Sequence, residues 1–449
     1  MLYIHGGLFE FGTGASNRAG PEYLLNHDVV LVTINYRLGV LGFLSTGDDE
    51  APGNWAMKDQ VAALRWVRDN IHNFGGDPNK ITLMGHSAGA TSVHFHMFSP
   101  LSRGMFHRAI SQSGTAFSPF MLPLFDPFAK AQEQAWTVGC PKGSSVEMVR
   151  CLRKLDVAYL VENQLRLWQP VVEAKRASNP DPFLTSSALE VAQSGDFYKV
   201  PWLMGSTSQE GALYGERNII DPTRRTRFTE RFDTEGPGDL ALSLSLDTSQ
   251  IPETWRQIRD FYFGERSVIN IDAMIKMYTD RYIDHSVHKA AVIHTRAGHH
   301  PIYRYNFAYQ GRYSYAHLSE LRKPDTNLGV VHSDDLLYLV PLPIMNVWPA
   351  NHPDLQVVKL MATLWTNFAT YGDPTPLSNA TGVTWEPFSG ITHSYLNFSQ
   401  EEALYAEVHG IRPLKLNMER ELYMDRMQFW DSLPLRENEI YYTTRKRIT

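Results

Sequence analysis

The sequence has few cysteines, no long apolar run and no excess of basic residues. A membrane-spanning helix needs 18 or more consecutive apolar residues, and no stretch approaches that length, so we expect no transmembrane segment. Lys plus Arg number 42 against 48 Asp plus Glu, a formal net charge of −6 that argues against nucleic acid as a partner. Repeats and low-complexity tracts are also absent. The 449 residues, 43% apolar and 20% charged, therefore indicate a globular protein with a large core.

The two cysteines, Cys140 and Cys151, are either separate buried thiols or a disulfide that closes a short loop. Two sequons, beginning at Asn379 and Asn397, would accept glycans in an exported protein. Met1 is followed at once by a strand-like apolar run, with no basic segment or cleavage site of a signal peptide. These signals leave two interpretations, an intracellular protein or a chain that starts inside a longer one.

Strand and helix patterns alternate along the chain. Residues 28–36 (DVVLVTINY) are rich in β-branched residues and predict a strand buried on both faces. Helical spacing of apolar residues predicts a helix over 55–73, and KITLMG at 80–85 predicts the next strand. Strand, helix and strand joined by short turns indicate a parallel sheet. The composition does not shift along the chain, so we expect a single domain over residues 1–449.

The segment Gly85-His86-Ser87-Ala88-Gly89 matches the pattern G-x-S-x-G between a predicted strand and a predicted helix. A sharp turn of this kind exposes a serine hydroxyl, and it needs residues without side chains two positions away on each side. The following helix would then place the Ala88 N–H near a developing oxyanion. The alternative interpretation is an ordinary flexible Gly-Ser turn.

Other parts of a nucleophilic site follow from local context. His5-Gly6-Gly7 comes after the first strand and is a candidate second oxyanion element. The chain order expected in such a site is serine, acid, histidine. Glu210 lies just past the strand predicted at 199–205, and His332 ends an apolar run, so both are candidates, although spacing alone does not assign either role.

Taken together, these motifs resemble the type-B carboxylesterase family over essentially the whole chain. The matching segments are His5-Gly6-Gly7, Asn35-Tyr36-Arg37, Gly53-Asn54 with Asp59-Gln60, Phe74-Gly75-Gly76-Asp77-Pro78, Gly85 to Gly89, Ala109 to Gly114, Gln209-Glu210-Gly211 and His332-Ser333-Asp334-Asp335. The resemblance implies an α/β-hydrolase fold, with a mostly parallel central sheet flanked by helices.

The resemblance also implies roles for individual residues. Ser87 would be the nucleophile, Glu210 the acid and His332 the base, with an oxyanion hole formed by the N–H groups of Gly7, Leu8 and Ala88. Ser113 corresponds to a serine that packs beside the triad in this family, and Cys140–Cys151 to a family disulfide. Three positions depart from the family. Leu8 stands where glycine or alanine is usual, Trp55 replaces a family glycine, and His86 stands where cholinesterases carry glutamate, which disfavours a choline ester.

Family members carry a signal peptide and early strands before the strand that begins here at Met1. The resemblance therefore implies that this chain is incomplete at its N-terminus, that the first edge strands are missing, and that the full-length protein is secreted.

The sequence as a whole predicts a carboxylesterase that cleaves small-molecule esters through an acyl-enzyme, without a metal or an organic cofactor. The aromatic residues Phe9, Phe11 and Phe117 either line an apolar substrate pocket or pack in the core. Two alternatives are a non-catalytic adhesion or binding protein of the same fold and an inactive fragment of a longer esterase. The sequence determines neither the ester nor the oligomeric state.

Overall fold

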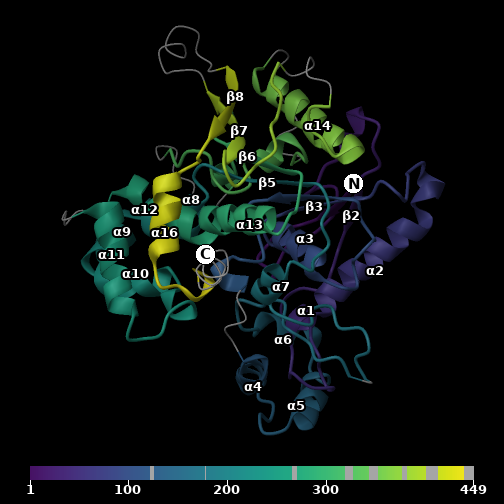
Figure 1. The fold of residues 1–449 in the computed structure, drawn as a ribbon. Helices are drawn as coiled ribbons and strands as arrows, with labels where there is room; N and C mark the ends of the chain where they lie inside the picture. The colour runs from purple at the N-terminus through teal and green to yellow at the C-terminus, as the bar shows by residue number, and fades with distance from the viewer. Residues whose placement is uncertain are drawn as a thin grey trace.

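A computed structural model describes residues 1–121, 126–176, 178–264, 270–318, 327–342, 352–376, 382–400 and 413–438. Its centre is an eight-stranded sheet with the strand order β2-β1-β3-β4-β5-β6-β7-β8 (Figure 1). Strands β1 to β7 pair in parallel and β8 pairs antiparallel with β7. The strands are β1 (Leu2–Ile4), β2 (Val32–Ile34), β3 (Thr82–His86), β4 (Arg108–Gln112), β5 (Trp202–Thr207), β6 (Ile302–Phe307), β7 (Ser394–Gln400) and β8 (Leu414–Arg420).

Helices cover the sheet and extend beyond it. The group α8 to α12 packs together at one end of the molecule, with α4 and α5 at another (Figure 1). The helices are α1 (Gly39–Phe43), α2 (Trp55–Asn70), α3 (Ala88–Phe98), α4 (Pro127–Thr137), α5 (Ser145–Leu152), α6 (Val157–Glu162), α7 (Ala188–Ser194), α8 (Gly211–Ile220), α9 (Pro222–Glu230), α10 (Phe232–Asp239), α11 (Ile251–Phe263), α12 (Ile271–Thr279), α13 (His285–Arg296), α14 (Asp354–Tyr371) and α16 (Met424–Ser432). Among the described helices, none has both the length and the apolar character to cross a bilayer.

Neighbouring residues of each central strand point into two different apolar cores. In β3, Leu83 belongs to the core shared with α2, α3 and α13, whereas Met84 belongs to the core shared with α14. Side chains alternate across a strand, so a strand with both faces covered reads as a continuous apolar run. The predicted α/β-hydrolase architecture, a mostly parallel sheet flanked by helices, is confirmed.

One strand prediction was wrong in its burial. Residues 28–36 were expected to form a strand buried on both faces, but only Val32–Ile34 is extended in the sheet and all three residues are half-buried. Strand β2 lies at the edge of the described sheet, paired only with β1. An apolar run indicates a strand, but it does not give the strand's position in the sheet.

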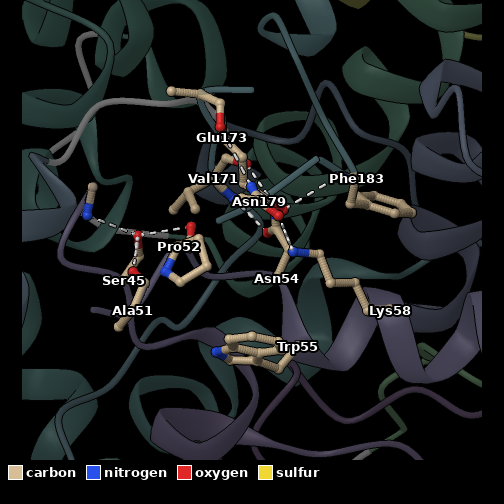
Figure 2. Close-up of polar contacts among 12 residues, drawn as sticks. Ser45, Ala51, Pro52, Asn54, Trp55, Lys58, Val171, Glu173, Asn179 and Phe183 are labelled. Atoms are coloured by element: carbon tan, nitrogen blue, oxygen red, sulfur yellow. Dashed lines mark hydrogen bonds and ion pairs between the residues drawn. The ribbon is translucent and has the colours of Figure 1, made fainter. Parts of the chain in front are cut away.

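A buried polar cluster ties the beginning of α2 to the distant segment 171–183 (Figure 2). The Glu173 carboxylate accepts hydrogen bonds from Asn54 Nδ2 at 2.6 Å and Asn179 Nδ2 at 2.9 Å, and it pairs with Lys58 Nζ at 2.7 Å. Asn54 also exchanges two hydrogen bonds with the backbone of Val171. These contacts fix the loop that enters α2.

Candidate active site

The candidate residues gather where parallel strands end. Gly7 follows β1, Ser87 follows β3, Ser113 follows β4 and Glu210 follows β5. Because the carboxyl ends of parallel strands meet at one edge of the sheet, this edge is where such folds bind ligands.

Ser87 occupies the strained turn between β3 and α3. Its backbone has φ 56° and ψ −121°, a conformation that a residue with a side chain rarely adopts. A Cβ on Gly85 would lie 2.2 Å from the Gly89 carbonyl oxygen, and a Cβ on Gly89 would lie 2.0 Å from that of Ile4. The two glycines are therefore required by close packing, as the G-x-S-x-G pattern predicts.

The turn is held by hydrogen bonds on both sides. The Ser87 N–H donates to the Gln112 carbonyl at 2.8 Å, and the Thr91 N–H donates to the Ser87 carbonyl at 2.9 Å. Every residue of α3 is buried, whereas Ser87 itself is partly exposed. The serine thus stands at the positive end of a buried helix, where negative charge is stabilised.

Glu210 and His332 form a buried pair. His332 Nδ1 lies 2.5 Å from Glu210 Oε2, and the two side chains are 5% and 0% exposed. The other oxygen, Oε1, accepts from the Ser113 hydroxyl at 2.5 Å and from the Thr207 N–H at 2.7 Å. With its carboxylate held by three donors, Ser113 among them, Glu210 fixes the orientation of the imidazole.

Backbone pairing brings the two distant segments together. The Gln209 N–H donates to the Val330 carbonyl at 3.0 Å, and the Val330 N–H donates back to Gln209 Oε1 at 2.7 Å. Gln209 and Val331 form an isolated parallel bridge. His332 is therefore positioned beside Glu210 by the chain immediately before each residue.

Two further carboxylates lie close to His332 but have other partners. Asp335 accepts from Gln112 Nε2 at 2.9 Å and from the Tyr305 hydroxyl at 2.6 Å. Asp334 accepts from the Val331 N–H at 2.8 Å, and burial raises its pKa to about 8. Neither carboxylate hydrogen-bonds to the imidazole, so the geometry singles out Glu210 among these three acids.

The loop after β1 approaches the serine closely. A Cβ on Gly6 would lie 2.9 Å from the Ser87 Cβ. Gly7, Leu8 and Phe9 have consecutive positive φ angles of 114°, 53° and 61°. The N–H groups of Gly7, Leu8 and Ala88 make no hydrogen bond to another described residue, whereas the Gly7 carbonyl accepts from two N–H groups of its own turn. Leu8 is 39% exposed, whereas the next residue, Phe9, is fully buried.

His86 belongs to the site although the sequence assigned it no role beyond disfavouring a choline ester. Its ring centroid lies 4.7 Å from that of His332, and its buried Nε2 has no partner among the described residues. Burial, and then the neighbouring His332, hold the pKa of His86 well below its usual range. This side chain is therefore uncharged. The position of His86 directly before Ser87 was the sequence signal that could have identified it.

The structure also places the two cysteines and the three candidate pocket aromatics. Cys140 and Cys151 form a disulfide. Phe9 and Phe117 are buried in the larger core and Phe11 is 59% exposed, so these aromatics do not form a common pocket.

Of the two sequon asparagines, Asn397 lies among the described residues and Asn379 does not. Asn397 lies on β7, where its Nδ2 donates to Glu419 Oε1 at 2.9 Å and its Oδ1 accepts from Asn306. A glycan on Asn397 would have to displace these contacts.

The chain belongs to the carboxylesterase family, whose sequence model matches residues 1–430. It is 37% identical to a juvenile hormone esterase of Tribolium castaneum, over 98% of this chain and 78% of that protein. It is also 34% identical to a carboxylic ester hydrolase of Bombus ignitus (98% and 77%) and 32% identical to venom carboxylesterase-6 of Apis mellifera (98% and 77%).

A solved structure gives the same result. The crystal structure of juvenile hormone esterase from Manduca sexta, with OTFP covalently attached, superposes with a TM-score of 0.79 at 26% identity, over 96% of this chain and 80% of that one. The predicted family, fold and carboxylic ester hydrolase activity are thereby confirmed, and a non-catalytic binding protein is not favoured.

Proposed function

We propose that Ser87, Glu210 and His332 carry out ester hydrolysis through an acyl-enzyme. His332 removes the Ser87 proton as Oγ attacks the ester carbonyl, while Glu210 keeps the proton of the imidazole on Nδ1. The buried 2.5 Å contact between His332 and Glu210, at the same sheet edge as the strained Ser87, is the observation that carries this proposal.

The negative charge of the tetrahedral intermediate is stabilised by the N–H groups of Gly7, Leu8 and Ala88. A donor of this kind contributes about 3–4 kcal/mol to the transition state. His332 then protonates the leaving alcohol, and the acyl group remains on Ser87. In the second half, His332 removes a proton from water, which attacks the acyl carbonyl and releases the acid with Ser87 restored.

The proposed substrates are uncharged small-molecule esters. His86, beside His332, is uncharged rather than anionic, so it provides no electrostatic attraction for a cationic choline group. The ester-hydrolysing relatives named above support the substrate class without selecting one ester.

A burst assay tests the nucleophile. With p-nitrophenyl butyrate, the protein should release a stoichiometric burst of p-nitrophenol, followed by slower turnover as the acyl-enzyme hydrolyses. Ser87→Ala should abolish the burst and lower kcat by about 10⁴-fold or more. Ser194→Ala makes the same change at an exposed serine at the end of α7 and should leave both phases intact. A full burst from folded Ser87→Ala would refute the proposal.

We further propose that the protein is secreted. The Cys140–Cys151 disulfide supports this, because disulfides form and persist in oxidising compartments. Peptide mass spectrometry of the extracellular fluid should recover the disulfide-linked peptide and reveal whether Asn379 or Asn397 carries a glycan. Recovery from the cytosol alone, with both thiols reduced, would contradict secretion.

A further inference from the structure

Glu10 has a buried carboxylate that the proposed reaction does not use. It directly follows the loop residues Gly7 to Phe9, and its side chain is only 6% exposed. Its Oε1 accepts from the Leu167 N–H at 2.6 Å, and its Oε2 pairs with Arg166 Nη1 at 2.7 Å. A carboxylate is costly to bury unless donors compensate its charge, so these contacts hold it in one position.

The segment that receives Glu10 is itself anchored. The Leu165 N–H donates to Gln134 Oε1 of α4 at 2.7 Å. Lys130 Nζ, also on α4, donates to the carbonyl oxygens of Arg166 at 3.0 Å and Leu167 at 2.5 Å. Glu10 therefore connects the loop after β1 to a segment that α4 holds in place.

The loop needs anchors because its backbone is strained. Leu8 and Phe9 adopt the left-handed conformation, which costs free energy for residues with a side chain and persists only where the surroundings impose it. On one side, Phe9 is fully buried and its carbonyl accepts from the Gly39 N–H at 2.7 Å. On the other side, the Glu10 N–H donates to the Gly7 carbonyl at 2.9 Å, which sets the turn containing the Gly7 and Leu8 N–H groups.

We propose that Glu10 is a positioning residue for the oxyanion hole. Its carboxylate, fixed by the backbone of Leu167 and the guanidinium of Arg166, holds the N–H groups of Gly7 and Leu8 toward Ser87. The inference rests on the proposed function, because it takes these N–H groups as oxyanion donors. Glu10 touches no reacting atom and acts only through the loop.

The test separates transition-state stabilisation from substrate binding. A trifluoromethyl ketone serves as the probe: Ser87 Oγ adds to its carbonyl carbon, the serine proton passes to His332, and the resulting tetrahedral oxyanion occupies the hole. In Glu10→Ala we expect kcat for p-nitrophenyl butyrate and affinity for this ketone to fall together by about 10- to 100-fold, with KM changed by less than about threefold. Glu10→Gln keeps an acceptor for the Leu167 N–H and should recover part of both losses.

Asp196→Asn is the matched control. Asp196 pairs with Arg103 at the same 2.7 Å distance, but its side chain is 82% exposed and its neighbours are not in the site. This variant should keep kcat, KM and ketone affinity within about twofold of the wild type, as expected for an exposed ion pair.

The outcomes distinguish this inference from the proposed function. If Ser87→Ala abolishes the burst while both Glu10 variants retain wild-type kcat and ketone affinity, the proposed function stands and the role of Glu10 is refuted. Loss of kcat without loss of ketone affinity in either variant also refutes it. If Glu10→Ala does not fold, Glu10→Gln is the deciding variant. Ketone affinity equal to that of the wild type overturns the inference. A parallel loss of kcat and ketone affinity, with KM little changed, supports it.

Discussion

At the scale of single residues, the space around a glycine determines whether it can be replaced. A methyl group on Gly89 would lie 2.0 Å from the Ile4 carbonyl oxygen, a backbone atom of β1 that cannot move without disturbing the central sheet. Gly143, in the loop between α4 and α5, has no atom within 4 Å of the same position. Packing therefore excludes a side chain at position 89, whereas there is room for one at position 143.

Gly89→Ala should therefore lower the free energy of unfolding by about 3 kcal/mol or more, because an overpacked backbone contact has no flexible neighbour to yield. Gly143→Ala should change it by less than about 1 kcal/mol. Urea unfolding monitored by circular dichroism measures both. Equal stability of the two variants would show that the packing against Ile4 does not require glycine.

At the scale of elements, local patterns were predicted better than distant contacts. The strand expected at 80–85 is Thr82–His86, and the turn at Ser87 follows it because glycine spacing is a local signal. Strand β2 was misjudged because burial depends on which strands lie beside it. Glu10 was missed because its partner Arg166 is 156 residues further along the chain, and neither residue belongs to a motif.

The cluster at the beginning of α2 is another such distant contact. The side chain of Glu173 is fully buried and its partner Lys58 is 18% exposed. Removing one member of a buried ion pair leaves the other uncompensated. Glu173→Ala should therefore cost about 3 kcal/mol, at the lower end of the usual range because Lys58 retains some solvent.

Urea unfolding compares this variant with two others. Glu253→Ala breaks an exposed pair with Arg256 and should cost less than about 1 kcal/mol. Adding Lys58→Met to Glu173→Ala should recover part of the loss, because the uncompensated charge is removed. A loss below about 1 kcal/mol in Glu173→Ala would mean that the cluster does not hold the loop.

At the scale of the whole molecule, buried histidines link stability to pH. The Ala116 N–H donates to His94 Nδ1 at 3.1 Å, so His94 must donate from Nε2 to His294 Nε2, 2.8 Å away. His294 then donates from Nδ1 to His299 Nδ1 at 2.8 Å, and His299 donates from Nε2 to the Val200 carbonyl at 2.5 Å. In this arrangement each of the three rings is neutral and has one defined tautomer. Protonating any of them would place two N–H donors opposite each other.

Burial lowers the pKa of His94 and His294 well below 6.5 and that of His299 to about 4. The charge of Lys199 further lowers the pKa of His294 and of His299, and His300 further lowers the pKa of His299. The unfolded chain binds protons at these rings near pH 6.5 and the folded chain does not, so this stability is complete above pH 6.5 and is lost as the pH falls toward 4.

Buried acids act in the opposite direction. Burial raises the pKa of Asp280 and Asp334 to about 8 and that of Asp284 to about 6, so the folded chain binds these protons more tightly than the unfolded chain. Asp335 shifts the same way. Six buried histidines with strongly lowered pKa outnumber these four acids: His86, His94, His96, His288, His294 and His299. Below pH 6.5 the histidines dominate. Between pH 6.5 and 8 the raised pKa values of the acids lower the stability, and the Met1 ammonium, whose pKa burial lowers to about 6, offsets part of this loss.

The free energy of unfolding should therefore be highest near pH 6.5, fall steeply toward pH 5 and fall gently toward pH 8. Urea unfolding at half-unit intervals measures this curve. His294→Gln should reduce the acid slope by up to about 1.4 kcal/mol per pH unit, the value of one proton. His72→Gln, at an exposed position in the turn after α2, should leave the slope unchanged. An unaltered slope in His294→Gln would mean that the histidine chain takes up protons without unfolding, and that the acid sensitivity arises elsewhere.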